Sequence, residues 1–496
     1  TTCPGRRLLM HTHLILGGPG AGKTHRLMDI LDSELSAGTR PDRIAFVSFT
    51  RRAVKEARER VLVRFKLSEH DTPYFRTLHS LAYSLCAFRA EQVLGSNAEH
   101  FKELEAYTST KFSTTIDAGD LSPYSGSIGD RGIFLDNFAR VTQTPLVEVA
   151  RRYGEGIRWN WLQWFSETLK AYKKLHALVD FTDMLESALS CAPIGIDVAI
   201  IDEAQDLSRL QWSVARTLFR NAKRVYYAGD DDQAIYKWGG ADVEEFLSLD
   251  PSTTEVLPKS NRLPDAVYRF SQSIIGRVRK RYRKHFSPSG RAGDVVQHRH
   301  YDSIPIHDGG QWLLLARNRI HLRMWEDLAR RRGVPYTTRR GGSVNHDDIE
   351  AIKIFENLRG GGTASGEQGN TVLKRIGARA KFKKEDVVRF KDIGVADVIW
   401  YRVFDGISEK RRAYYLAMLR RGVDISADPR VHIDTIHASK GGEADNVAVI
   451  TDVTRLTYRH IGDDPDDENR TFYVGVTRAK NTLHILLPQT TRSYKI

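Results

Sequence analysis

A glycine-rich loop near the start of the chain has the spacing of a phosphate-binding loop. Residues 17–24 read Gly-Gly-Pro-Gly-Ala-Gly-Lys-Thr and fit the pattern G-x-x-x-x-G-K-[ST]. The glycines let successive backbone N–H groups point at phosphate oxygens. Lys23 would then reach the β- and γ-phosphates, and the Thr24 hydroxyl would bind Mg²⁺. The pattern predicts a bound nucleoside triphosphate.

An acidic pair, Asp202-Glu203, follows the apolar run Val198–Ile201 and opens the stretch Asp-Glu-Ala-Gln-Asp. At the end of a buried strand, the Asp202 carboxylate suits an outer ligand of Mg²⁺. Glu203 beside it can orient and deprotonate an attacking water. A solvated helix cap is the alternative interpretation of a lone acidic pair, but the phosphate loop upstream favours hydrolysis.

A third polar segment, Gly229–Trp238, combines three aspartates with Gln233 and two aromatic residues. Gln233 is a candidate sensor of the γ-phosphate. Tyr236 and Trp238 alternate on one segment, and aromatic faces stack on unpaired bases at about 1–3 kcal/mol per base. Taken alone, the aspartates could form a solvated turn and the aromatic residues could belong to the core.

Apolar runs followed by helical patterns position these residues. The runs at 13–16, 44–49, 198–201 and 225–228 predict strands of a parallel sheet with crossover helices. A second set of strands is expected at 311–316, 447–450 and 483–486. The fold class is therefore α/β, with two domains that each carry a mainly helical insertion. The glycine-rich stretch 360–366 is expected to be a flexible linker.

The expected boundaries divide both domains into two parts. The first domain comprises 10–83 and 181–256 around a helical insertion at 84–180; the second comprises 257–342 and 429–496 around a shorter insertion at 343–428. A chain of 496 residues is too long for a single core, which agrees with this division.

The composition indicates a polyanionic partner. The net charge is +13 and the isoelectric point is about 9.5, as expected for binding nucleic acid, although a generally basic surface is the alternative. A basic run is either a phosphate contact or a solvated helix face; it contains Arg277, Arg279, Lys280, Arg281, Arg283, Lys284 and His285.

No apolar run is long enough for a membrane span. The three scattered cysteines favour reduced thiols, and a cytoplasmic location is expected, or host cytoplasm if the gene is phage-borne.

The order of these segments resembles that of superfamily 1 DNA helicases of the UvrD/Rep/PcrA type, including small phage, bacterial and F-box-type members. The resemblance covers nearly the whole chain. The matching segments are Gly17–Thr24 (motif I), 48–53 (Ia), 77–80 (Ib), 180–185, 202–206 (II), 229–238 (III), 257–262 (IV), 435–443 (V) and 473–479 (VI).

The resemblance implies two RecA-like domains, ATP with Mg²⁺ as cofactors, and a role for each matching residue. Arg262 and Arg478 would reach the γ-phosphate from the second domain, where such arginines stabilise the charge on the transferring phosphoryl group. The implied catalytic set is Lys23, Asp202, Glu203, Gln233, Arg262 and Arg478. The implied nucleotide contacts are Gly17, Gly20, Gly22, Lys23, Thr24, His25 and Glu443, with Thr24 and Asp202 holding Mg²⁺. The implied DNA contacts are Phe49, Thr50, Arg52, His79, Tyr236, Trp238 and His437.

The sequence departs from the family pattern at the adenine end of the site. No glutamine precedes Gly17, and Ser260-Asn261-Arg262 lacks the tyrosine of the usual Asn-Tyr-Arg. Adenine selectivity therefore stays open, and other triphosphates are candidates. Motif III ends Trp238-Gly239-Gly240 and lacks the usual arginine.

These residues together predict an NTP-driven helicase or translocase on single-stranded DNA. The resemblance implies 3′-to-5′ movement, a monomer, binding of single-stranded and partly duplex DNA, and no membrane partner, while any replication or repair loading partner stays open. The alternatives are a translocase that removes bound proteins with little unwinding, and a non-catalytic nucleic-acid-binding module.

Overall fold

The computed structural model describes residues 10–48, 51–97, 99–113, 126–424 and 427–496, and it divides into two compact units. The first unit comprises residues up to 262 together with 278–289; the second comprises 263–277 and 290–496. The expected boundary at 256/257 did not include the return of 278–289 to the first unit. The six domain ranges stay predictions.

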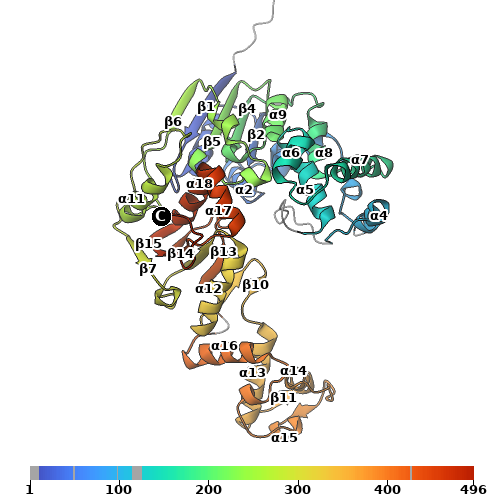
Figure 1. The fold of residues 1–496 in the computed structure, drawn as a ribbon, viewed down its shortest axis with the longest axis vertical. Helices are drawn as coiled ribbons and strands as arrows, with labels where there is room; N and C mark the ends of the chain where they lie inside the picture. The colour runs from blue at the N-terminus through green and yellow to red at the C-terminus, as the bar shows by residue number, and fades with distance from the viewer. Residues whose placement is uncertain (1–9, 49–50, 98, 114–125, 425–426) are drawn as a thin grey trace, which may run out of the picture. The chain divides into compact units, whose positions relative to one another are not determined.

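The first unit is built on a six-stranded parallel sheet (Figure 1). The order is β3-β2-β4-β5-β1-β6. The strands are β1 (His11–Leu16), β2 (Ile44–Ser48), β3 (Phe75–Arg76), β4 (Val198–Asp202), β5 (Arg224–Gly229) and β6 (Thr253–Val256). Because β4, β5 and β1 are neighbours and all run parallel, the segments that follow them leave the sheet at one edge.

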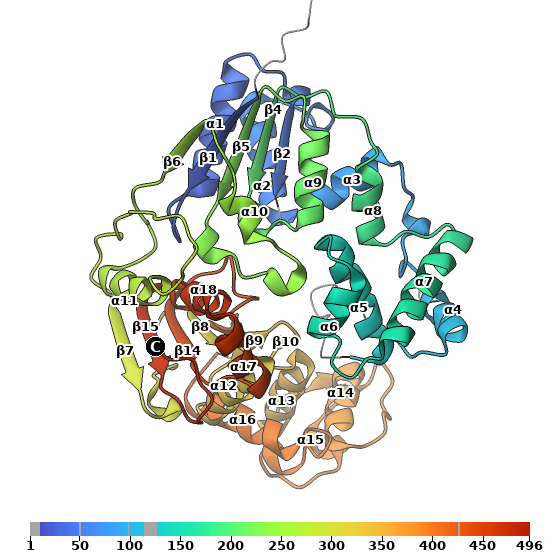
Figure 2. The same cartoon turned by 45° about the horizontal axis from the view of Figure 1, so that its top comes forward.

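Helices cover both faces of this sheet, which explains why β2 and β4 are buried along their whole length (Figure 2). In β4, Val198 and Ile200 pack into the core that includes α1, whereas Ala199 and Ile201 pack into the core that includes α9. The helices are α1 (Lys23–Ser36), α2 (Arg51–Phe65), α3 (Leu78–Leu85), α9 (Arg209–Leu218) and α10 (Val243–Leu247).

The helical insertion of the first unit lies between α3 and α9 along the chain. Its helices are α4 (Glu99–Thr108), α5 (Ile128–Val141), α6 (Leu146–Tyr153) and α7 (Trp159–Leu175), and α8 (Phe181–Ala188) follows it. The insertion has two small hydrophobic cores of its own. Phe165 of α7 is completely buried in one of them, and Leu162 of α7 is completely buried in the other. Helix α8 starts at a capping box in which Asp180 and Asp183 accept hydrogen bonds from each other's backbone N–H.

The second unit contains a seven-stranded sheet of order β10-β9-β13-β8-β14-β15-β7, parallel except for the β9–β10 pair. Its strands are β7 (Asp294–His298), β8 (Trp312–Ala316), β9 (Tyr336–Thr338), β10 (Gly341–Gly342), β13 (Val431–Thr435), β14 (Ala444–Ile450) and β15 (Ala479–Leu486). The helices outside the insertion are α11 (Asp265–Ile275), α12 (Arg319–Arg331), α17 (Arg455–Asp463) and α18 (Pro465–Val476). The two sheets confirm the predicted α/β class.

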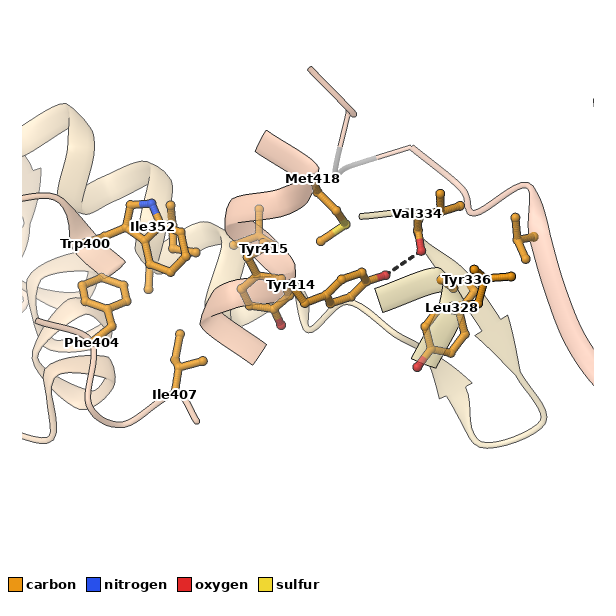
Figure 3. Packing of buried hydrophobic residues seen from close by; sticks show 14 of the residues in the cluster. Leu328, Val334, Tyr336, Ile352, Trp400, Phe404, Ile407, Tyr414, Tyr415 and Met418 are labelled. Atoms are coloured by element: carbon orange, nitrogen blue, oxygen red, sulfur yellow. Dashed lines mark hydrogen bonds between the residues drawn. The ribbon is translucent and has the colours of Figure 1, made fainter. Parts of the chain in front are cut away.

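The insertion of the second unit shares one hydrophobic core with this sheet. Figure 3 shows Tyr414 of α16 (Glu409–Arg420) donating a 2.9 Å hydrogen bond to the Val334 carbonyl, while Trp400 and Phe404 lie further along the same core. The remaining elements are α13 (His346–Arg359), β11 (Ala364–Ser365), α14 (Gly366–Ile376), β12 (Val387–Val388) and α15 (Phe390–Ile393).

The prediction of a flexible linker at 360–366 was wrong in its second half. Residues Ala364–Ser365 pair with Val387–Val388, and Gly366 opens α14. A Cβ atom on Gly366 would lie 1.7 Å from the Lys383 carbonyl oxygen. This glycine therefore permits a close backbone approach instead of providing flexibility.

Candidate nucleotide and nucleic-acid site

The phosphate loop connects β1 directly to α1, so the predicted strand–loop–helix context is present. Gly20 and Gly22 adopt positive φ angles of 72° and 82°, and Gly22 caps the helix. The Lys23 ammonium donates a 2.9 Å hydrogen bond to the Gly17 carbonyl, which folds the side chain back over the loop. Thr24 lies half-buried in the first helical turn, while the His25 side chain is 73% exposed.

The segment Ser260–Arg262 donates hydrogen bonds to two backbone carbonyl groups of the phosphate loop. The Asn261 backbone N–H donates to the Gly20 carbonyl at 2.9 Å, and the Ser260 hydroxyl donates to the Pro19 carbonyl at 2.6 Å. We expected Arg262 to lie in the second α/β domain, but its contacts assign it to the first unit. Sequence reasoning missed the role of Ser260 because nothing in its local pattern signals a distant partner.

Asp202 and Glu203 lie where β4 ends, as expected. The Asp202 carboxylate is 2% exposed and accepts a 2.9 Å hydrogen bond from the Glu203 backbone N–H. Burial, with the neighbouring charge of Glu203, raises the pKa of Asp202 to about 7, although Lys23 opposes this shift. Glu203 takes a left-handed backbone conformation with a φ of 52°. The site thus concentrates negative charge close to the phosphate loop.

These residues fit a divalent cation. Mg²⁺ prefers oxygen ligands, and the Thr24 hydroxyl and the Asp202 carboxylate are both oxygen donors. The pKa of Asp202 is raised first by burial and then by the charge of Glu203, and a bound cation would offset both effects. Bound there, Mg²⁺ would neutralise charge on the phosphates.

The turn after β5 connects the acidic pair to Gln233. Gln205 donates to the Glu203 carboxylate at 2.6 Å, and its side-chain oxygen accepts from the Asp230 backbone N–H at 3.0 Å. Gln233 in turn donates to the Asp230 carboxylate at 2.6 Å. A continuous path of hydrogen bonds through Gln205 and Asp230 therefore links Glu203 to Gln233. The sequence pattern assigns both residues to nucleotide hydrolysis.

The candidate DNA-contacting residues of the first unit lie partly beyond the described residues. Phe49 and Thr50 are outside them, as is the side chain of Arg52. Tyr236 and Trp238 are half-buried, with ring centroids 6.3 Å apart in an edge-to-face arrangement. Their partial exposure contradicts the alternative that both belong to the core.

His79 of α3 meets the half-exposed ring of Phe181 edge-on, with a centroid distance of 5.9 Å. Burial lowers the pKa of His79 to about 4, so the imidazole is neutral near pH 7. A neutral ring is suited to stacking rather than to attracting phosphate. The contact also places the segment 180–185 beside motif Ib.

In the second unit, motifs V and VI contact each other. Arg478 is 1% exposed and donates to the Val474 carbonyl at 2.9 Å and to the Gly442 carbonyl at 3.2 Å. Glu443, next to Gly442, is exposed, and His437 is half-buried. The guanidinium of Arg478 thus fixes the motif V loop, and its predicted contact with phosphate stays a prediction.

Within the described part of the chain, no helix combines the length and the apolar character needed to cross a bilayer.

Comparison with known proteins agrees with this geometry. Residues 6–254, half of the chain, match the UvrD/REP helicase N-terminal domain, and residues 405–490 match the UvrD-like helicase C-terminal domain. The ATP-dependent DNA helicase PcrA of Staphylococcus epidermidis is 22% identical over 391 residues, which is 70% of this chain and 51% of that protein. DNA helicase II of Salmonella typhimurium is 26% identical over 288 residues, 53% of this chain and 37% of its own length.

The chain spans about half the length of the curated relatives it matches. Both halves of the family's architecture are nevertheless matched in order, with the phosphate loop and the acidic pair in the first match and motifs V and VI in the second. The chain therefore belongs to the UvrD/REP helicase family.

Proposed function

We propose that the chain is an ATP-dependent DNA helicase or translocase that moves along single-stranded DNA and separates duplex. One observation carries this proposal: the phosphate loop, Asp202-Glu203 and Gln233 follow the adjacent parallel strands β1, β4 and β5. Ligands of α/β sheets bind at the carboxyl ends of such strands. Hydrolysis would use Lys23, Thr24 and Asp202 for the phosphates and Mg²⁺, with Glu203 activating water.

The same segment that ends in the nucleotide site also offers aromatic rings to bases. Gln233 is three residues before Tyr236 and five before Trp238. A change at the γ-phosphate would thus reach the DNA-contacting side chains through a short stretch of backbone. This supports a motor over a non-catalytic binding module, because a module would not require the complete set of phosphate-site residues.

The activities named for the relatives, those of an ATP-dependent DNA helicase and of DNA helicase II, agree with this function. We propose ATP as the main substrate with Mg²⁺, and 3′-to-5′ as the direction. Arg262, Arg478, Glu443 and His437 keep the roles that the family resemblance implies, as part of this proposal.

The first test is hydrolysis of ATP by the purified chain with and without single-stranded DNA. We expect DNA to stimulate hydrolysis, EDTA to abolish it, and Lys23→Ala to reduce it by at least about 10²-fold. Stimulated hydrolysis that survives Lys23→Ala would contradict the proposal.

The second test separates unwinding from translocation. Duplexes with a 3′ or a 5′ tail, each supplied with ATP, GTP, CTP or UTP, report direction and nucleotide selectivity together. Displacement of a protein roadblock without strand separation would support a translocase that clears bound proteins.

A further inference from the structure

The segment 278–289, which we call the strap, packs with the first unit although the chain on both sides of it belongs to the second. It contains no helix or strand beyond one isolated bridge, between Ser287 and Lys259. Two backbone hydrogen bonds of Ser287, with Pro258 and Ser260, hold it near one end, and side-chain contacts hold it elsewhere. The strap carries most of the basic run between Arg277 and His285. The sequence allowed two interpretations of that run, a contact with DNA phosphates or a solvated helix face.

Neither interpretation fits Lys284. Its side chain is 0% exposed, and its ammonium contacts the carboxylates of Asp230 at 2.8 Å and of Asp232 at 3.1 Å, and also that of Asp231. All three carboxylates are 0% exposed as well. A fully buried ammonium surrounded by three carboxylates can contact neither DNA nor solvent.

Two further groups of the strap bind the same turn. Arg281 donates to the Asp232 carboxylate at 2.7 Å, and the Tyr282 backbone N–H donates to the Asp231 carboxylate at 2.9 Å. The three aspartates could otherwise be taken for a cation site, because their oxygens lie close together. The Lys284 ammonium already occupies the position among these oxygens that a cation would take.

The electrostatics show that the ammonium stays charged. Burial alone would lower the pKa of Lys284, but the three aspartates outweigh burial and raise it. Burial would likewise raise the pKa of Asp230, and Lys284 reverses that shift and lowers it. Each charge is therefore maintained by the other, and removing one leaves the rest buried without compensation.

The turn that Lys284 holds is the one that connects Glu203 and Gln233. Asp230 accepts from Lys284 and from Gln233, and its backbone N–H donates to Gln205, which binds Glu203. We propose that Lys284 is a positioning residue for nucleotide hydrolysis: through Asp230 it fixes the side chains of Gln233 and Glu203 in place. This inference rests on the proposed function, since it assigns Lys284 a part in that reaction.

The test compares Lys284→Met with Lys280→Met, a matched control on the same strap whose side chain is 72% exposed. Steady-state ATP hydrolysis is measured with and without oligo(dT), together with circular dichroism to confirm folding. We expect kcat of Lys284→Met to fall at least about tenfold while KM for ATP stays within about twofold, because the lost interaction serves the transition state. In the assay without oligo(dT), Lys280→Met should retain both constants.

A folded Lys284→Met protein with wild-type kcat, or with a raised KM alone, would overturn the inference. If Lys284→Met does not fold, Arg281→Gln decides, since Arg281 is partly exposed and its guanidinium binds Asp232 of the same turn. A lower kcat at unchanged KM then supports the inference, and an unchanged kcat overturns it. Absence of DNA-stimulated hydrolysis in the wild type would instead contradict the proposed function, so the two failures are distinct.

Discussion

The hydroxyl of Ser260 donates a 2.6 Å hydrogen bond to the carbonyl oxygen of Pro19, across 241 residues of sequence. Ser260 is buried, and its hydroxyl also accepts a 3.2 Å hydrogen bond from the Arg262 backbone N–H. The phosphate loop is therefore shaped by the motif IV segment as well as by its own glycines. This relationship makes Ser260 a determinant of the loop's conformation.

Replacing Ser260 by alanine should weaken nucleotide binding without slowing the chemical step. The change removes both hydrogen bonds of the hydroxyl, and the buried one to Pro19, which shapes the loop, is worth about 1 kcal/mol, or about a fivefold rise in the Kd for ATP. Equilibrium titration with a fluorescent ATP analogue measures this directly, and kcat should change little. Ser287→Ala is the control, because Ser287 makes a similar but exposed contact with the Pro258 carbonyl at 3.2 Å. Equal effects of the two changes would contradict the prediction.

Gly18→Ala should distort the phosphate loop by steric conflict. A Cβ atom at residue 18 would lie 2.4 Å from the ring of Phe286, which is itself buried. Overpacking of this kind costs about 1–3 kcal/mol, so ATP affinity should fall by roughly tenfold.

The double variant Gly18→Ala/Phe286→Val provides the control for this steric argument. Removing the ring should restore most of the lost affinity, as measured by the same titration. Gly462→Ala, where a Cβ atom meets nothing within 4 Å, should leave affinity unchanged. Failure of the double variant to recover would show that the ring is not the cause.

The parts of the site that the sequence predicted are those encoded locally. The phosphate loop, Asp202 and Gln233 each follow a strand whose apolar residues are contiguous, so strand order alone brings them to one edge. The structure contains further contacts that depend on tertiary packing. Ser260 and Lys284 act on segments that are distant along the chain, and no residue pattern near them identifies those partners.

The cysteines illustrate the same limit. Their spacing suggested three scattered thiols, yet the Sγ atoms of Cys86 and Cys191 lie 3.6 Å apart. The two residues come directly after α3 and shortly after α8, the helices on either side of the insertion, and these helices pack against each other. A separation of 105 residues hides such a pair from any short-range motif.

Lys173→Met should destabilise the insertion of the first unit. Lys173 is 6% exposed and its ammonium contacts the carboxylates of Asp180 and, at 2.6 Å, Asp183. Burial would raise the pKa of Asp180, but Lys173 and Arg140 outweigh it and keep the carboxyl ionised. Removing one partner of such a buried pair costs about 3–5 kcal/mol.

Urea denaturation followed by tryptophan fluorescence measures this loss, since Trp159, Trp161 and Trp164 all lie in α7, the helix that carries Lys173. Lys174→Met is the matched control, because the neighbouring lysine is exposed. The two variants should differ clearly in their urea midpoints, and coincident midpoints would rule out a stabilising role for Lys173.

The second unit should lose stability as the pH falls from 6.5 towards 4, because of a buried histidine pair. His298 and His484 share a 2.9 Å hydrogen bond between β7 and β15, and the His484 ring stacks on Trp312. Burial, with the nearby His298, lowers the pKa of His484 from 6.5 to about 4. Above pH 6.5 neither the folded nor the unfolded chain protonates this ring. Between pH 6.5 and 4 the unfolded chain binds a proton that the folded chain does not, so unfolding becomes more favourable as pH falls.

Thermal unfolding at pH 7.5, 6, 5 and 4 should therefore show a smaller decrease in Tm for His484→Leu than for the wild type. His300→Leu, which changes an exposed histidine next to β7, should retain the wild-type dependence, and an unaltered slope in His484→Leu would exclude the pair as the cause.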